Sequence, residues 1–125
     1  MIWSFVQVAL GGALGASMRY ASILGVVGLF GVRFPIGTLL VNILGSLLLG
    51  FLVVLIDQRN WASLAPFLII GILGGFTTFS AFSLDAYNLF ARGDLIACLA
   101  YVVFSVSFSI SALFIGIIIG RYITL

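Results

Sequence analysis

Four long apolar stretches alternate with short polar segments along the chain, at residues 3–30, 36–56, 64–84 and 95–120. The second stretch contains no charged residue, and about 20 apolar residues in a helix are enough to cross the hydrocarbon core of a membrane. The other three stretches are at least as long. The pattern therefore predicts an all-α membrane protein with four transmembrane helices in one domain, residues 1–125, and loops at residues 31–35, 57–63 and 85–94.

The composition also favours a membrane protein. Hydrophobic residues make up 64% of the sequence and charged residues 6%, whereas about a quarter of an ordinary soluble domain is charged. No basic segment precedes the first apolar run, so we do not expect a cleaved signal peptide. The net charge of +2 is too small to indicate a nucleic-acid partner.

The sequence lacks histidine and paired carboxylates, on which much enzyme chemistry depends. The sequence has no histidine and one cysteine, Cys98, which excludes histidine acid–base chemistry, Cys/His metal clusters and an intrachain disulfide. The three carboxylates, Asp57, Asp85 and Asp94, form no pair at a catalytic spacing. We therefore expect that the protein is not an enzyme and uses no organic cofactor.

The third stretch contains a segment rich in small and hydroxylic residues, GILGGFTTFSAFS at residues 71–83. Gly74 and Gly75 weaken a helix by about 1 kcal/mol each relative to alanine. The hydroxyls of Thr77 and Thr78 can satisfy backbone groups that an unwound turn leaves free. The segment therefore predicts a helix break between Gly74 and Thr78, buried in protein or lining a polar cavity. A close helix crossing is the alternative, which explains the glycines but not the hydroxyls.

Polar side chains recur at every fourth position of the second stretch, at Thr38, Asn42 and Ser46. On a helix they form one stripe. An asparagine amide in a membrane needs partners for two N–H donors and one acceptor. Asn42 is therefore interpreted either as an interhelical hydrogen bond or as a contact to a solute, and the stretch alone does not decide between them.

The fourth stretch contains serines at alternating positions, SVSFSIS, which in isolation is typical of a strand. The length of the surrounding apolar run favours a helix. On a helix Ser105 and Ser109 share a stripe with Tyr101, while Ser107 and Ser111 lie nearly opposite. At least one of these stripes must face protein or solute rather than lipid.

Phenylalanines lie three residues apart at Phe76, Phe79 and Phe82, with Ser80 and Ser83 among them. Such a stripe is most often packing. Aromatic ring edges carry partial positive charge, however, so rings turned edge-on could face an anion.

The first stretch pairs Gly11 with Gly15, a spacing that lets membrane helices approach closely. Arg19 is unusual, because an arginine at the centre of a membrane helix costs about 2.5–3.5 kcal/mol. We expect Arg19 to be a structural anchor, at the interface or on backbone carbonyls, rather than a ligand contact. Gly75 is likewise expected to be structural.

The distribution of arginines between the loops favours neither orientation in the membrane. With four spans, Arg59 and Arg121 fall on the side of the termini, and Arg33 and Arg92 on the other. Orientation follows the excess of lysine and arginine in short loops. The balance predicts insertion in both orientations and assembly as an antiparallel pair.

Three segments resemble the Fluc-type fluoride channels, also called CrcB proteins: GGALGASMRY (11–20), GTLLVNILGSLLLG (37–50) and GGFTTFSAFS (74–83). Their order and spacing match, and the resemblance covers essentially the whole chain. It implies a dual-topology, antiparallel homodimer with two pores. It also implies passive, selective fluoride export across the microbial inner membrane, which relieves fluoride toxicity.

The resemblance also implies roles for particular residues. Fluoride-pore residues would be Asn42, Phe79, Phe82, Ser80, Tyr101, Ser105 and Ser109. A central structural Na⁺ would be held at the dimer axis by backbone carbonyls of Gly74 and Thr77, since unwound backbone suits a hard cation. Ala81 stands where the family often has threonine, so no role for that hydroxyl is carried over.

Two other functions are compatible with parts of the sequence. A small dual-topology multidrug exporter needs a carboxylate embedded in the membrane, but the first two stretches have none and Asp85 lies at the end of the third. A structural subunit that only packs helices in a larger assembly would account for the glycines.

Overall fold

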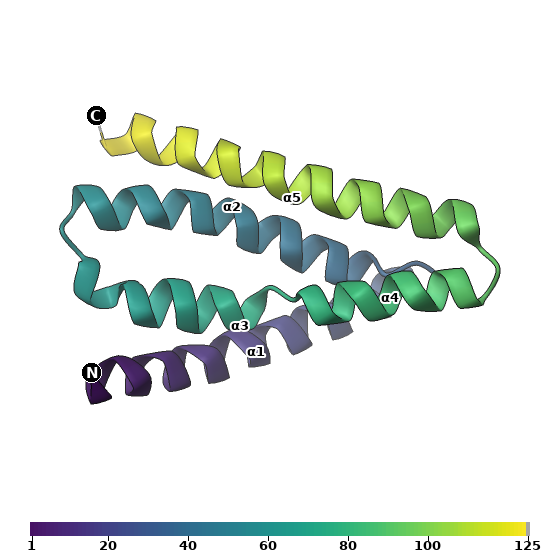
Figure 1. The fold of residues 1–125 in the computed structure, drawn as a ribbon, viewed down its shortest axis with the longest axis horizontal. Helices are drawn as coiled ribbons and strands as arrows, with labels where there is room; N and C mark the ends of the chain where they lie inside the picture. Colours follow the sequence, from purple (N-terminus) through teal and green to yellow (C-terminus); the bar gives the residue numbers. More distant parts are fainter. Residues whose placement is uncertain (125) are drawn as a thin grey trace.

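The computed structural model describes residues 1–124, which form helices and turns and no β-strand. Leu125, the last residue of the predicted domain, lies outside the described residues. Four helical spans lie side by side with alternating direction, and both termini are at the same end (Figure 1). The spans are α1 (Ile2–Phe30), α2 (Ile36–Gln58), a composite third span (Ala62–Ala91) and α5 (Leu95–Thr124). The predicted all-helical fold with four spans is thus confirmed.

The third span consists of several pieces. A 3-10 turn η1 (Ala62–Leu64) leads into the π-helical η2 (Pro66–Leu73), and then into α3 (Gly74–Phe76) and α4 (Phe79–Ala91). Between α3 and α4 the chain leaves the helix over two residues, Thr77 (φ −80°, ψ 157°) and Thr78 (φ −152°, ψ 120°). Figure 1 shows this extended link near the middle of the bundle.

Backbone conformation and capping set the helix ends. Gly31 ends α1 at φ 77° and Gly93 turns the chain at φ 79°, a region that glycine adopts without strain. The predicted loop at residues 85–94 is wrong in its first seven residues, because α4 continues to Ala91. Its polar positions lie on helical turns near the end of the span, where polar side chains need no loop.

Glycines bring α1 against η2 and α3, and α2 against α5. A Cβ added to Gly71 would lie 2.8 Å from the Cα of Gly11, and one added to Gly75 would lie 2.8 Å from the Gly12 carbonyl oxygen. Side chains added to Gly50 or Gly116 would overlap backbone carbonyls across the α2–α5 crossing. These glycines are therefore required for close backbone approach.

Candidate functional site

A cleft of about 330 Å³ opens beside the extended link, between α2, α4 and α5. It gathers five of the seven predicted pore residues from three separate parts of the chain: Asn42, Phe79, Phe82, Ser105 and Ser109. The remaining lining residues are Ser46, Leu49, Thr77, Thr78, Val106 and Ile110. None of the lining side chains is charged.

Asn42 ties α2 to the extended link. Its Oδ1 accepts a hydrogen bond of 2.7 Å from the Thr78 N–H, and its Nδ2 donates one of 2.9 Å to the Thr78 carbonyl. The interhelical hydrogen bond that the sequence allowed is therefore present. One N–H of the amide is left over, since Nδ2 carries two hydrogens. The two interpretations of Asn42 are thus compatible.

Thr78 is the residue that sequence analysis missed as a partner. Besides binding Asn42, its Oγ1 accepts a 3.1 Å hydrogen bond from the Ala81 N–H and so caps α4. The cap has a sequence signal, a threonine ahead of a helical run. The pairing with Asn42 has none, because 36 residues separate the two.

Ser105 and Ser109 present hydroxyls to the cleft from consecutive turns of α5. Their Oγ atoms are buried, and among the described residues neither has a hydrogen-bond partner. A buried polar group without a partner lowers stability by about 1–3 kcal/mol, so these hydroxyls are free to bond an ion or a polar solute. Ser107 and Ser111 are exposed on the outside of α5 and do not line the cleft.

The phenylalanine stripe divides in two. Phe76 is buried, with 5% of its surface exposed, and serves packing. Phe79 and Phe82 line the cleft with ring centroids 5.4 Å apart. Phe79 is 77% exposed in the single chain.

Tyr101 and Ser80 lie outside the lining of the cleft. Tyr101 is fully buried behind Phe82, with ring centroids 5.4 Å apart, and its hydroxyl donates to the Asp85 carboxylate at 3.2 Å. Ser80 is exposed, and its Oγ lies 3.3 Å from Thr78 Oγ1. Sequence analysis missed Asp85 as the partner of Tyr101.

The extended link also frees two backbone carbonyls. In an unbroken helix the Gly74 carbonyl would accept from the Thr78 N–H, but that N–H bonds Asn42. The Thr77 carbonyl would accept from the Ala81 N–H, which bonds Thr78 Oγ1. The oxygens of these two carbonyls are ligands of the kind that could coordinate a hard cation. Residues 1–124 contain no cluster of three or more His, Cys, Asp or Glu side chains that could do so.

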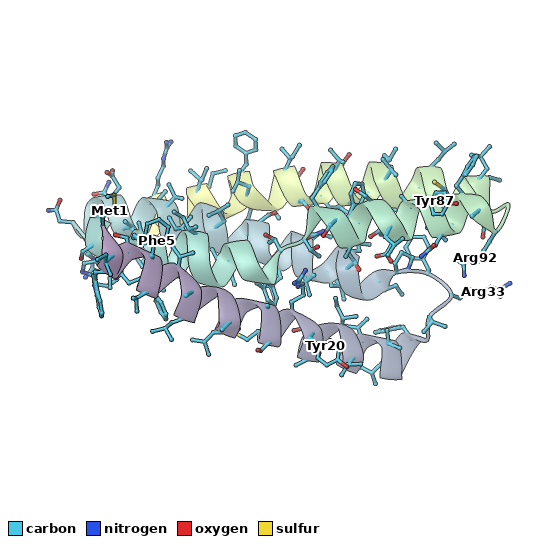
Figure 2. The ribbon with its side chains drawn as sticks, turned by 60° about the horizontal axis from the view of Figure 1, so that its bottom comes forward. Met1, Phe5, Tyr20, Arg33, Tyr87 and Arg92 are labelled. Atoms are coloured by element: carbon cyan, nitrogen blue, oxygen red, sulfur yellow. The ribbon has the colours of Figure 1, made fainter. Side chains whose placement is uncertain are left out.

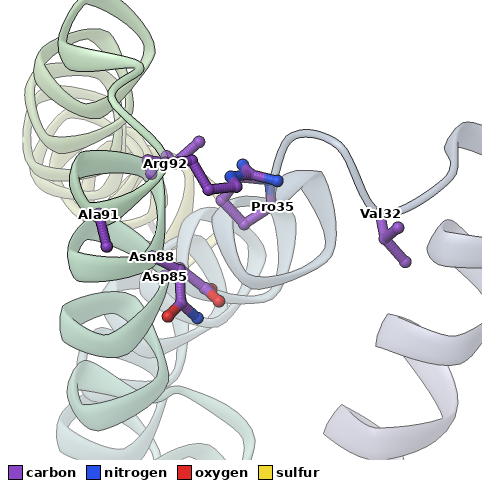
Figure 3. Close-up of a pocket in the computed structure, with 7 residues that line it drawn as sticks. Val32, Pro35, Asp85, Asn88, Ala91 and Arg92 are labelled. Atoms are coloured by element: carbon purple, nitrogen blue, oxygen red, sulfur yellow. The ribbon is translucent and has the colours of Figure 1, made fainter.

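A second cavity, of about 410 Å³, lies where the loop after α1 meets the turn after α4. Figure 3 shows Asp85 and Asn88 projecting from α4 into it, with the Arg92 side chain beside Pro35. Arg92 Nη2 donates a 2.9 Å hydrogen bond to the Arg33 carbonyl. Both arginines lie at the end of the bundle opposite Met1 (Figure 2).

Arg19 is half-buried on α1 and makes no hydrogen bond or ion pair within residues 1–124. Its anchoring role stays a prediction.

Comparison with known proteins identifies relatives over nearly the whole chain. A family model described as "CrcB-like protein, Camphor Resistance (CrcB)" matches residues 6–117. The protein named fluoride-specific ion channel FluC of Cereibacter sphaeroides is 54% identical over 116 residues, 93% of each chain. Proteins of the same name from Paracoccus denitrificans and Agrobacterium fabrum are 49% and 50% identical over 118 and 116 residues. These alignments cover 94% of both chains for the former, and 91% of this chain and 93% of the relative for the latter.

The resemblance that the three glycine-rich segments indicated is thereby confirmed. The match spans all four membrane helices, and the chain is a multi-pass membrane protein that belongs to the CrcB family.

Proposed function

We propose that this protein is a fluoride-selective channel that lets fluoride leave the cell passively and so relieves its toxicity. One observation carries the proposal: two buried, unpartnered hydroxyls, of Ser105 and Ser109, share an uncharged cleft with the Asn42 amide and two phenylalanine rings. Relatives that are about half identical to the chain are named fluoride-specific ion channels. The prediction that the protein is not an enzyme is confirmed by this family.

The cleft has the chemistry that a small, strongly hydrated anion requires. Fluoride must exchange the hydrogen bonds of water for other donors, and the cleft offers hydroxyls and an amide N–H. The ring edges of Phe79 and Phe82 add weaker positive poles. Conduction needs sites that an ion can leave again, and the absence of charged side chains from the lining meets that need.

We propose that two chains assemble as an antiparallel homodimer with two pores, surrounded by lipid in the inner membrane. Arg33 and Arg92 at one end balance Arg59 and Arg121 at the other, which supports insertion in both orientations. Phe79 lies beside the cleft and is largely exposed, so a partner chain would cover it and complete the wall. Tyr101 would support Phe82 from behind, and Ser80 would add a hydroxyl next to Thr78.

A structural Na⁺ held by the Gly74 and Thr77 carbonyls belongs to the same proposal. Both carbonyls have lost their helical N–H partners, and Gly74 is exposed in the single chain, open to a symmetry mate. The ion would supply positive charge that satisfies both oxygens. This chain's own contribution is to keep Thr77 and Thr78 extended.

Fluoride efflux from liposomes tests the proposal directly. Purified protein is reconstituted with fluoride inside, and release is followed with a fluoride electrode after addition of valinomycin. We expect rapid release that requires valinomycin, while chloride-loaded liposomes retain their chloride. Correctly assembled protein that releases no fluoride would overturn the proposal.

A further inference from the structure

Gly45 of α2 lies directly against the extended link. A Cβ added at Gly45 would overlap the Cγ2 methyl of Thr77 and lie 3.2 Å from Cδ1 of Phe76. This obstruction differs from those at the helix crossings, where the added atom would meet backbone. At Gly45 the closest obstacle is one methyl group of one side chain.

The position of Thr77 in turn sets the course of the link. Its N–H and its Oγ1 both donate to the Leu73 carbonyl at 2.9 Å, so the residue is held at the end of the helix. Immediately after it, Thr78 is held by both ends of the Asn42 amide. Asn42 and Gly45 are three positions apart on α2 and therefore lie on one face. One face of α2 thus positions the link in two ways: Asn42 bonds Thr78, and the absence of a side chain at Gly45 leaves room for Thr77.

We infer that Gly45 is a positioning residue for the pore: the missing side chain lets Thr77 lie against α2, which keeps Thr78 within reach of Asn42. Gly45 would act through the position of Thr77 rather than through contact with an ion. The inference rests on the proposed function when fluoride flux is measured. A second, structural measurement of the backbone at Thr78 does not depend on that function.

A double-mutant cycle tests it. Gly45→Ala should lower fluoride efflux by about tenfold or more, because an overpacked site must shift its neighbours. Thr77→Ser removes the obstructing methyl but keeps the hydroxyl that bonds Leu73, so its own efflux serves as the reference for the combined variant. The combined variant should recover to within about threefold of Thr77→Ser. Gly25→Ala is the matched control, because a Cβ there meets nothing within 4 Å.

The threonines provide the structural readout. The sequence has four, and Thr38 and Thr124 lie in helices α2 and α5 as references for Thr77 and Thr78. With threonine-selective ¹³C labelling, the Cα and Cβ shifts of Thr78 should be those of extended backbone in the wild type. They should move in Gly45→Ala and return in the combined variant.

Each outcome decides the inference. Rescue of either flux or the Thr78 shifts by Thr77→Ser supports it, including rescue of a Gly45→Ala protein that fails to assemble. It is overturned if Gly45→Ala matches wild type in both readouts, or if Thr77→Ser restores neither. Absence of fluoride flux in the wild type would count against the proposed function alone, since the shift cycle stands without it.

Discussion

Helices meet in two different ways in this molecule. At the α1–η2 and α2–α5 crossings, glycines such as Gly11, Gly71 and Gly50 place backbone against backbone and leave no room for a side chain. Around the cleft, helices are held apart by side chains, and two hydroxyls are left without partners. Close packing is what gives membrane helices their affinity, since lipid supplies no hydrophobic drive between them.

The difference teaches where stability and function reside. A crossing depends mainly on volume, because backbone meets backbone there, whereas flux through the cleft depends mainly on the polarity of the lining. Substitutions of the two kinds should therefore separate: the first should lower the amount of folded protein, and the second should lower the flux through it.

The largest effect is expected from filling a crossing. Gly15→Val would place side-chain atoms into the Ile72 carbonyl of η2, where only backbone movement can make room. We expect a loss of about 3 kcal/mol or more, enough to abolish assembly of a marginal membrane protein. Size-exclusion chromatography and a thermal melt in detergent measure it.

The control for Gly15→Val is Gly25→Val on the same helix, where an added Cβ meets nothing within 4 Å. Equal melting temperatures for the two variants would show that the α1–η2 crossing does not depend on backbone contact.

The next largest effect is expected at the Asn42 amide. Asn42→Asp removes the donor to the Thr78 carbonyl and introduces a negative charge into an uncharged cleft. A charge at that depth costs about 2.5–3.5 kcal/mol, and an anion would also be repelled, so fluoride efflux should fall by about a hundredfold or more. The measurement is efflux per assembled protein.

Gln7→Glu is the control for Asn42→Asp, because Gln7 is an amide that joins α1 to the third span away from the cleft. Its Nε2 donates to the Ser63 carbonyl at 3.0 Å, between the start of α1 and η1. Gln7→Glu should lower the melting temperature with flux per assembled protein unchanged. A comparable flux loss in both variants would remove the distinction between the two regions.

An intermediate effect is expected from the rings. Phe82→Ile keeps an apolar side chain in the cleft but removes a ring edge and the contact to Tyr101. We expect about a tenfold lower efflux with assembly retained, corresponding to an aromatic interaction of about 1.4 kcal/mol. Phe67→Ile in η2 is the control and should affect melting only. Normal flux through Phe82→Ile would exclude a role for its ring edge.

The sequence predicted the spans well, because a membrane helix is specified by a local run of apolar residues. Five of the seven predicted pore residues lie in the cleft, and those predictions came from the stripes containing Asn42 and Ser105 and from the family resemblance. The glycines of the third span were ambiguous. Gly75 packs against Gly12 of α1, whereas Gly74 is exposed with helical φ and ψ of −64° and −34°, and the link itself is Thr77 and Thr78.

Contacts between distant parts of the chain could not be predicted. The Asn42–Thr78 pair and the Asp85–Tyr101 bond join residues on different helices, and no periodicity marks them. The sequence also left undecided which face of α5 lines the cleft, because α5 has apolar residues all round and serines on two faces.

The smallest effect is expected at the unpartnered hydroxyls, and it has opposite signs in the two readouts. Ser105→Ala and Ser109→Ala each remove a buried oxygen that has no partner, so the melting temperature should stay the same or rise. The free energy of unfolding should increase by up to about 1 kcal/mol. Fluoride efflux should nevertheless fall by about two- to tenfold, the worth of one lost hydrogen bond to the ion. Ser107→Ala and Ser111→Ala on the outer face should change neither quantity. If instead the outer pair lowers flux while Ser105→Ala and Ser109→Ala leave it intact, the ion passes on the opposite side of α5 and the cleft is only a packing defect.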